Sequence, residues 1–322
     1  MKHLRILAAV IVLLLVAYRA SAQSGLEEVS YGSAGPTGAE WIVYIANDMG
    51  FFRQEGLHLS IVVTGSTVST INQIATGDIN FATAGTDSVV NAVARKLAIK
   101  IVAPSMVTPP YSLMVSPSIT NWQQLKGKTI SLATKQEITA IAFRLMAKAN
   151  HLDWNNDFSI VLAGSTPARY AALQSGNVQG AMLGQPFNFT AETQGMRTLD
   201  ESFNYMKVWM FDGIAINPAW ASAHRPTVVK FIRALRKAAA YGYTHRDDAI
   251  KILTTETKSD RAIIEKTYDL DFVKWKAYAR DEQLDPKKIQ GVIDGVVAQG
   301  VLPAPIAVSD VIDTSYAREA AR

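Results

Sequence analysis

The sequence predicts an α/β protein of two lobes, each built on a mostly parallel sheet flanked by helices, with a cleft between the lobes. Three observations lead to this prediction. Short apolar runs alternate with amphipathic helical patterns between residues 28 and 105, which is typical of parallel strands joined by helices. The alternation breaks at Thr108-Pro109-Pro110 and starts again beyond residue 116. The chain of 322 residues is also longer than a single hydrophobic core usually needs.

The first lobe is expected to comprise residues 23–115 and to be completed by residues 206–322. Its first helix is predicted over residues 39–52, because apolar side chains recur there at spacings of three and four. The other elements expected before the second lobe are strands 28–32, 57–63, 79–82, 100–105 and 111–115, with helices 68–75 and 88–95.

The second lobe is expected over residues 116–205 and repeats the same architecture. A strand within residues 206–217 is then predicted to lead back to the first lobe, and the remaining chain is strongly helical. The elements expected in the second lobe are strands 129–133, 158–162 and 178–183, with helices 138–149, 167–175 and 187–193. The C-terminal helices are expected over residues 226–244, 246–254, 260–268 and 286–298.

The N-terminus has the three parts of an export signal. A basic start precedes an uninterrupted apolar run over residues 6–16, and Ala20-Ser21-Ala22 is a small-residue cleavage site. The run is shorter than the roughly 20 residues of a membrane span, although a short membrane anchor is the alternative. We therefore expect residues 1–22 to be a signal peptide, cleaved after Ala22, and the mature protein to reach the periplasm.

The composition excludes several classes of function. The chain has no cysteine, which excludes disulfides, thiolate metal sites and a cysteine nucleophile. Removal of the leader would take away three of the 32 Lys and Arg residues and none of the 28 Asp and Glu residues. The mature chain is then nearly neutral and lacks the basic field that nucleic-acid binding requires. We expect no nucleic-acid partner, no cofactor, no metal ion and a monomer.

Small polar residues stand where the expected strands give way to helices. Helix starts leave backbone N–H groups free, and ligands of open α/β sheets gather at the carboxyl ends of strands. The same side chains could instead only cap their own helices, so both interpretations stay open. Asp87 is expected mainly as a cap; facing the cleft, it would favour an amine or hydroxyl over an anion. The candidate contacts of the first lobe are Ser33, Thr37, Ser66, Thr67, Thr86 and Asp87.

Two aromatic residues are further candidates. Trp41 could stack on a planar ligand, although an aromatic residue in a helical stripe can equally belong to the core. Tyr111 lies near the expected crossing between the lobes and could offer its hydroxyl group.

Six motifs occur in a characteristic order: Gly50-Phe51-Phe52 with Glu55-Gly56-Leu57, Gly65-Ser66-Thr67, Gly77-Asp78-Ile79-Asn80-Phe81-Ala82, Leu125-Lys126-Gly127-Lys128-Thr129-Ile130, Ala171-Ala172-Leu173-Gln174-Ser175-Gly176-Asn177-Val178 and Gln185-Pro186. In this order they resemble the substrate-binding proteins of bacterial ABC importers for nitrate, sulfonate and taurine. That family also includes binders of thiamine-pyrimidine precursors. The resemblance covers roughly residues 32–240. It implies a two-lobed, type II-like periplasmic binding protein that closes about a hinge, with the permease and ATPase on other chains.

The resemblance also implies ligand contacts from the second lobe. They would lie at Thr134-Lys135-Gln136 and near Gln185, where family members often carry Glu-Pro. Here Gln185 removes a negative charge and Lys135 could supply a counter-charge. Both departures favour an anionic solute such as a sulfonate or carboxylate. A thiamine-pyrimidine-like precursor stays open as the alternative.

Other functional classes find less support. The histidines are dispersed, no Gly-x-Ser-x-Gly elbow occurs, and Gly127-Lys128-Thr129 lacks the upstream glycine of a phosphate loop. The related fungal pyrimidine-synthesis enzymes depend on a Cys-rich motif that this chain cannot form. We therefore expect no enzyme. A ligand sensor that reports to a membrane receptor would have the same two lobes and stays open.

Overall fold

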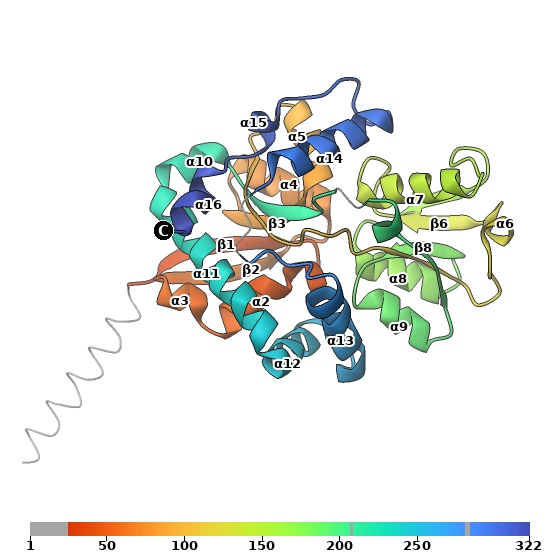
Figure 1. Ribbon diagram of the computed structural model, residues 1–322, viewed down its shortest axis with the longest axis horizontal. Coiled ribbons are helices and arrows are strands. Elements are labelled where there is room, and N and C mark those ends of the chain that lie inside the picture. The colour runs from red at the N-terminus through yellow and green to blue at the C-terminus, as the bar shows by residue number, and fades with distance from the viewer. Residues whose placement is uncertain (1–24, 207–208, 281–283) are drawn as a thin grey trace, which may run out of the picture.

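The computed structural model describes residues 25–206, 209–280 and 284–322. It contains two five-stranded sheets, each flanked by helices (Figure 1). The α/β prediction is therefore confirmed. The expected signal peptide, residues 1–22, lies outside the described residues. Within the described residues, no helix is long and apolar enough to cross a membrane.

The first sheet has the strand order β2-β1-β3-β10-β4. Strand β1 pairs in parallel with β2 and β3, whereas β10 is antiparallel to both of its neighbours. Four strands therefore share one direction and only β10, which returns from the other sheet, is reversed. The strands are β1 (Glu27–Ser33), β2 (Leu57–Val63), β3 (Phe81–Gly85), β4 (Lys100–Pro104) and β10 (Asp212–Ile216).

The second sheet has the order β7-β6-β8-β5-β9, and its reversed strand is β5. Because β5 pairs with β8 and β9, residues 112–115 belong to this sheet, although we expected them at the end of the first lobe's opening segment. The edge strand β9 is absent from the sequence prediction because it is mostly polar and none of its residues is buried. The strands are β5 (Ser112–Val115), β6 (Thr129–Leu132), β7 (Ser159–Leu162), β8 (Gly180–Leu183) and β9 (Arg197–Glu201).

The helices cover the two sheets and close the C-terminal end. Along the first sheet's strands they are η1 (Gly38–Glu40), α2 (Trp41–Asp48), α3 (Phe51–Gln54), α4 (Thr67–Thr76) and α5 (Thr86–Ala94). Along the second sheet's strands they are α6 (Trp122–Leu125), α7 (Ile138–Ala149), α8 (Thr166–Gln174), α9 (Phe187–Thr193) and η2 (Ser202–Asn204). The C-terminal set is α10 (Pro218–Ala223), α11 (Arg225–Thr244), α12 (Arg246–Thr257), α13 (Arg261–Tyr268), the π-helix η3 (Asp269–Lys274), α14 (Pro286–Ala298), α15 (Val308–Val311) and α16 (Ser315–Ala320).

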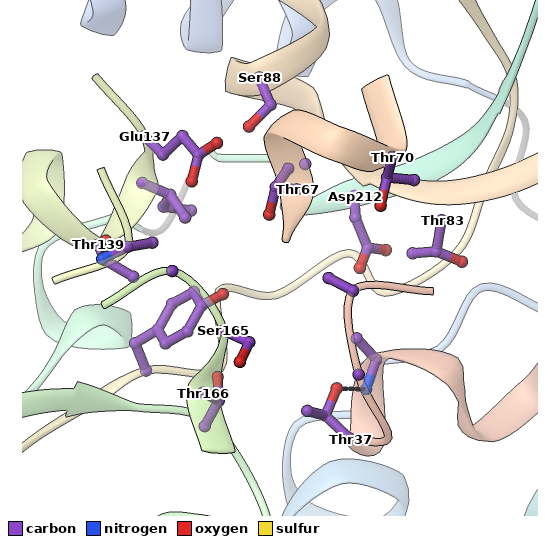
Figure 2. A pocket seen from close by; sticks show the side chains of 18 of the residues that line it. Thr37, Thr67, Thr70, Thr83, Ser88, Glu137, Thr139, Ser165, Thr166 and Asp212 are labelled. Atoms are coloured by element: carbon purple, nitrogen blue, oxygen red, sulfur yellow. Dashed lines mark hydrogen bonds between the residues drawn. The ribbon is translucent and has the colours of Figure 1, made fainter. Parts of the chain in front are cut away.

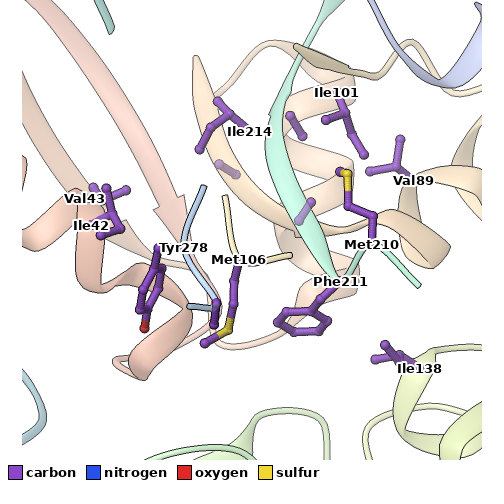
Figure 3. Packing of buried hydrophobic residues seen from close by; sticks show 14 of the residues in the cluster. Ile42, Val43, Val89, Ile101, Met106, Ile138, Met210, Phe211, Ile214 and Tyr278 are labelled. Atoms are coloured by element: carbon purple, nitrogen blue, oxygen red, sulfur yellow. The ribbon is translucent and has the colours of Figure 1, made fainter. Parts of the chain in front are cut away.

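The core of the first sheet is held by side chains far apart in the sequence. Ile101 of β4, Val89 of α5 and Ile214 of β10 are fully buried and lie together around the returning strand (Figure 3). The rings of Phe81 and Phe231 stack with centroids 3.8 Å apart and join β3 to α11. Helix α11 also packs on α2 and α16. The C-terminal helices thus complete the lobe that the N-terminal strands begin.

Candidate ligand-binding cleft

A cavity lies between the two sheets and takes its walls from both. About 710 Å³ of empty space lies between these walls, part of which is open solvent. Figure 2 shows polar side chains from the two lobes around this space. The first lobe contributes Ala34, Gly35, Thr37, Ala39, Glu40, Thr67, Thr70, Thr83, Gly85, Asp87, Ser88, Phe211 and Asp212. The second sheet's half contributes Ala133, Glu137, Ile138, Thr139, Gly164, Ser165, Thr166, Pro167 and Arg169, with Tyr111 at the crossing between the sheets.

The walls form where strands end and helices begin. Ser66 is the N-cap of α4, and its Oγ accepts a hydrogen bond from the backbone N–H of Ser69 at 3.2 Å. Thr67, the first residue of that helix, then reaches the cavity. In the same way the carboxyl ends of β1, β3, β6 and β7 lead into lining segments, as expected for open α/β sheets.

Asp87 links the two lobes. It does not cap its own helix; its Oδ2 accepts a hydrogen bond from the backbone N–H of Ile138, at the start of α7, with an N···O distance of 2.6 Å. Its Oδ1 is buried without a hydrogen-bond partner. Burial, together with the nearby Glu137 carboxylate, raises the pKa of Asp87 to about 7. The expectation that Asp87 caps its own helix is therefore wrong: its carboxylate accepts from the first residue of a helix across the cleft.

Three further carboxyl groups surround the same space. Burial raises the pKa of Glu137 to about 7 and that of Glu40 to about 7, and it raises the pKa of Asp212 well above its usual value. Glu137 and Asp212 point towards the space between the lobes (Figure 2). Glu40 accepts hydrogen bonds from the Thr37 hydroxyl at 2.7 Å and from its backbone N–H at 3.3 Å, completing a capping box. Asp212 accepts one from the backbone N–H of Met106 at 2.6 Å.

Arg169 is the one basic side chain in the described lining of the cavity, and only 2% of its surface is exposed. Its Nε donates to the Met182 carbonyl at 2.7 Å, and its Nη2 donates to the Thr166 hydroxyl at 2.8 Å. Its Nη1 donates to the Gly164 carbonyl. The guanidinium group also lies 5.7 Å from the centre of the Tyr111 ring. Much of its donor capacity is therefore used in fixing the second lobe's wall.

Four of the predicted contact residues line the cavity: Thr37, Thr67, Asp87 and Tyr111. Three other first-lobe candidates are buried behind its wall. Ser33 exchanges hydrogen bonds with the backbone of Gly35, Thr86 is fully buried with an unpartnered hydroxyl, and Trp41 donates to the Ala249 carbonyl within an aromatic core. Ser66 caps α4 and is likewise outside the lining.

The candidates from the second lobe also lie outside the lining. Thr134 accepts a hydrogen bond from the backbone N–H of Gln136, and the Lys135 side chain is exposed. Gln185 is buried, and neither polar atom of its side-chain amide has a hydrogen-bond partner. Its backbone carbonyl accepts from Gly38 N–H at 3.2 Å, which joins the lobes at a second point. The two residues that suggested an anionic solute therefore do not face the cavity.

The sequence analysis missed four of the five charged lining residues: Glu40, Glu137, Arg169 and Asp212. Two of them carry a readable signal. The spacing Thr37-x-x-Glu40 is a capping-box pattern. Asp212 interrupts an apolar run of the sequence, and a buried charge is costly unless it is paired or hydrogen-bonded. Among the described residues, no group of three or more His, Cys, Asp or Glu side chains is arranged to hold a metal ion.

Comparisons with known proteins place this fold. It is similar to the nitrate-binding protein NrtA of Synechocystis PCC 6803, with a TM-score of 0.77 and 14% identity over 92% of this chain and 88% of that one. It is also similar to the alkanesulfonate-binding protein SsuA of Xanthomonas axonopodis pv. citri, solved with bound MOPS, with a TM-score of 0.72 and 18% identity over 90% and 98% of the two chains.

Comparison of sequences finds relatives as well. The protein YtlA of Bacillus subtilis (strain 168), by its name a candidate binding protein, is 22% identical over 289 residues, covering 86% of this chain and 85% of that protein. The family model described as NMT1/THI5 like matches residues 40–249. This match covers more than half of the chain and confirms the family indicated by the motifs. The chain belongs to the NMT1/THI5-like family.

Proposed function

We propose that this chain is the periplasmic solute-binding component of an ABC-type importer and that it is not an enzyme. The observation that supports this most directly is the polar cavity, whose walls come from both sheets and are bridged by the hydrogen bond from Ile138 N–H to Asp87 Oδ2. A solute that contacts both walls lowers the free energy of the closed form, which a permease could then recognise.

The relatives agree with this proposal. SsuA and NrtA, which share the fold, are named for the small solutes that they bind. The export signal expected at residues 1–22 would deliver the mature chain to the periplasm. The proposal includes a division into two lobes. We expected residues 23–115 with 206–322 in one and 116–205 in the other, but residues 112–115 go with the second lobe because β5 pairs into its sheet. The permease and the ATPase would be other chains, with this one acting as a monomer.

The direct test is recovery of a bound solute. The full chain is exported in a bacterial host, purified from the periplasm and denatured, and the released small molecules are identified by mass spectrometry. We expect one compound in stoichiometric amount. Returned to stripped protein at about a hundred times its dissociation constant, it should add about 2.7 kcal/mol to the free energy of unfolding. Small-angle scattering should show a smaller radius of gyration with solute.

A pair of neighbouring substitutions controls this test. Thr67 lines the cavity, whereas Val68, the next residue of α4, is 52% exposed outside it. Thr67→Trp should fill the cavity and abolish co-purification, and Val68→Trp should leave it intact. Two outcomes would contradict the proposed function. One is equal recovery of the compound from both variants; the other is that no compound is recovered and small-molecule extracts of the host do not stabilise the protein.

A further inference from the structure

We propose that the solute is a small organic cation with at least two N–H donors, bound between Asp87 of one lobe and Glu137 of the other. This inference rests on the proposed receptor function and concerns the chemistry of the same cleft. It replaces the anionic solute that Lys135 and Gln185 suggested, because neither side chain lines the cavity. Amines and amidines are the solute class that this arrangement fits.

The balance of charges carries the first step. The charged side chains that face the cavity are Glu40 of η1, Asp87 of α5, Asp212 of β10, Glu137 before α7 and Arg169 of α8; the Tyr111 phenol is the further titratable group. Four acidic groups thus face one basic group in a space largely shielded from water. Glu40, Asp87 and Glu137 have pKa values of about 7 and are therefore partly ionised at neutral pH. In the ionised form they would repel an anion, whereas a bound cation would favour that form.

The second step concerns the one candidate anion ligand. Arg169 could attract an anion only with the N–H groups that remain after its bonds to Met182, Gly164 and Thr166. Its guanidinium group therefore acts mainly as a brace for the loop before α8. Three of its five N–H groups are used in this way, one on each nitrogen, and two remain for a ligand.

The third step concerns Asp87 Oδ1, a hydrogen-bond acceptor that has no donor. Asp87 lines the cavity. Its Oδ2 accepts from Ile138 N–H, whereas its Oδ1 is buried without a hydrogen-bond partner. Gly85 keeps the space beside this oxygen open, since a Cβ atom there would lie 2.9 Å from Oδ1. An N–H donor of the solute would satisfy this oxygen, whose burial without a partner otherwise costs free energy.

The same arrangement explains why the lobes would close on the solute. Asp87 and Glu137 lie on opposite lobes; burial raises the pKa of Asp87, and repulsion by the Glu137 carboxylate raises it further. Closure without a solute therefore brings two carboxyl groups together at a cost. A cation that contacts both groups turns this repulsion into attraction only in the closed form. The Tyr111 and Phe211 rings, with centroids 5.5 Å apart, line the cavity and can cover its carbon skeleton.

Isosteric probes separate the two charge classes. Isothermal titration of stripped mature protein would compare benzamidine with benzoate and benzenesulfonate, and butylamine with butyrate and butanesulfonate. We expect a cation to bind and its anionic counterparts not to bind. Since the carboxyl groups titrate near pH 7, cation affinity should rise about tenfold between pH 6 and pH 8, as a group of that pKa ionises. Binding at pH 7 should release protons, measured in buffers of different ionisation enthalpy.

Conservative variants locate the effect. Asp87→Asn and Glu137→Gln should each weaken benzamidine binding at least tenfold and reduce its pH dependence. Glu28→Gln serves as the matched control, because Glu28 is exposed in an ion pair with His58 at the opposite end of β1. Circular dichroism and thermal unfolding establish that each variant is folded.

The outcomes are distinguishable from failure of the receptor function. Binding of benzoate or a sulfonate, or binding of neither cation at millimolar concentration, would overturn the cationic class. An anion that binds and reduces the radius of gyration would do so while leaving the receptor function standing. Undiminished cation binding in both carboxyl variants would remove Asp87 and Glu137 from the site.

Discussion

Single residues decide which parts of the loop after β1 face the cleft. Glu40 lines the cavity, whereas the adjacent Trp41 turns into the core, where its ring meets Phe272 edge-on with centroids 5.1 Å apart. Its indole N–H donates to the Ala249 carbonyl at 2.8 Å. One step along the chain thus separates a cleft residue from a packing residue. Trp41 therefore stabilises the lobe without reaching the cavity.

Trp41→Phe tests this assignment. The substitution keeps an aromatic ring but leaves the Ala249 carbonyl without its donor and opens a small cavity. We expect a loss of about 2–4 kcal/mol in the free energy of unfolding, measured by urea denaturation. Affinity for the recovered solute should stay within about twofold of wild type, provided that the assay is run where the variant is folded. A large loss of affinity would instead support stacking of Trp41 on the ligand.

The sequence predicts which residues follow the strand ends, but it does not predict how deeply each side chain is buried. Thr37, Thr67 and Asp87 could be found because small polar residues after strands follow from local sequence. The depth of Arg169 depends on the carbonyl of Met182, which reaches it from β8. Lys135 could be placed in a loop but not oriented. The burial and orientation of these side chains depend on tertiary packing, which local sequence patterns do not encode.

At the scale of elements, the sequence predicts where a helix starts but not which residue bonds its first N–H groups. The sequence predicts both ends of α7, residues 138 and 149, because its apolar stripe is long and regular. Its N-cap residue, Glu137, makes no side-chain capping bond, and the donor group at Ile138 is satisfied by Asp87 of α5 instead. A cap supplied from 51 residues away cannot be read from neighbouring positions. The strand alternation was predictable, and this bond between the lobes was not.

The contact between α11 and η3 gives a prediction at this scale. Gly242 of α11 lies against Phe272, and a Cβ atom there would sit 2.8 Å from the ring. Alanine normally favours a helix over glycine by about 1 kcal/mol, but overpacking costs about 1–3 kcal/mol. We expect the cost of overpacking to exceed the gain in helix propensity, so that Gly242→Ala lowers the free energy of unfolding by about 1 kcal/mol or more in urea denaturation.

The exposed Ala240 in the same helix provides the control. Ala240→Gly should cost about 1 kcal/mol through helix propensity alone. If Gly242→Ala were stabilising by a similar amount, the packing of Phe272 against Gly242 would not be as close as the structure shows.

The molecule as a whole carries a set of buried carboxyl groups at the cleft. The pKa values of Glu40, Asp87 and Glu137 are raised to about 7 by burial. Between about pH 4.5 and pH 7 the folded protein therefore binds more protons than the unfolded chain. The stability that these protonated groups contribute is present at the acidic end and is lost as pH rises through 7.

We therefore expect the solute-free protein to lose stability between pH 5 and pH 8. Each group can contribute up to about 1.4 kcal/mol per pH unit in the window between its two pKa values. Urea denaturation at unit pH steps measures the slope. Glu40→Gln should flatten it, whereas Glu28→Gln, at an exposed position, should not. Stability that rises steadily from pH 5 to pH 8 in the solute-free protein would contradict the assigned burial.

The returning strand β10 also fixes an order of assembly. It lies between β3 and β4, so β4 joins the first sheet only through it. Until residues 212–216 have been made, β3 has an open edge and β4 has no strand beside it. The second sheet, by contrast, is continuous in sequence from residue 112 to residue 201. A chain emerging from its N-terminus can therefore complete the second sheet while the first is still unfinished, and the lobe that begins first is the last to be built.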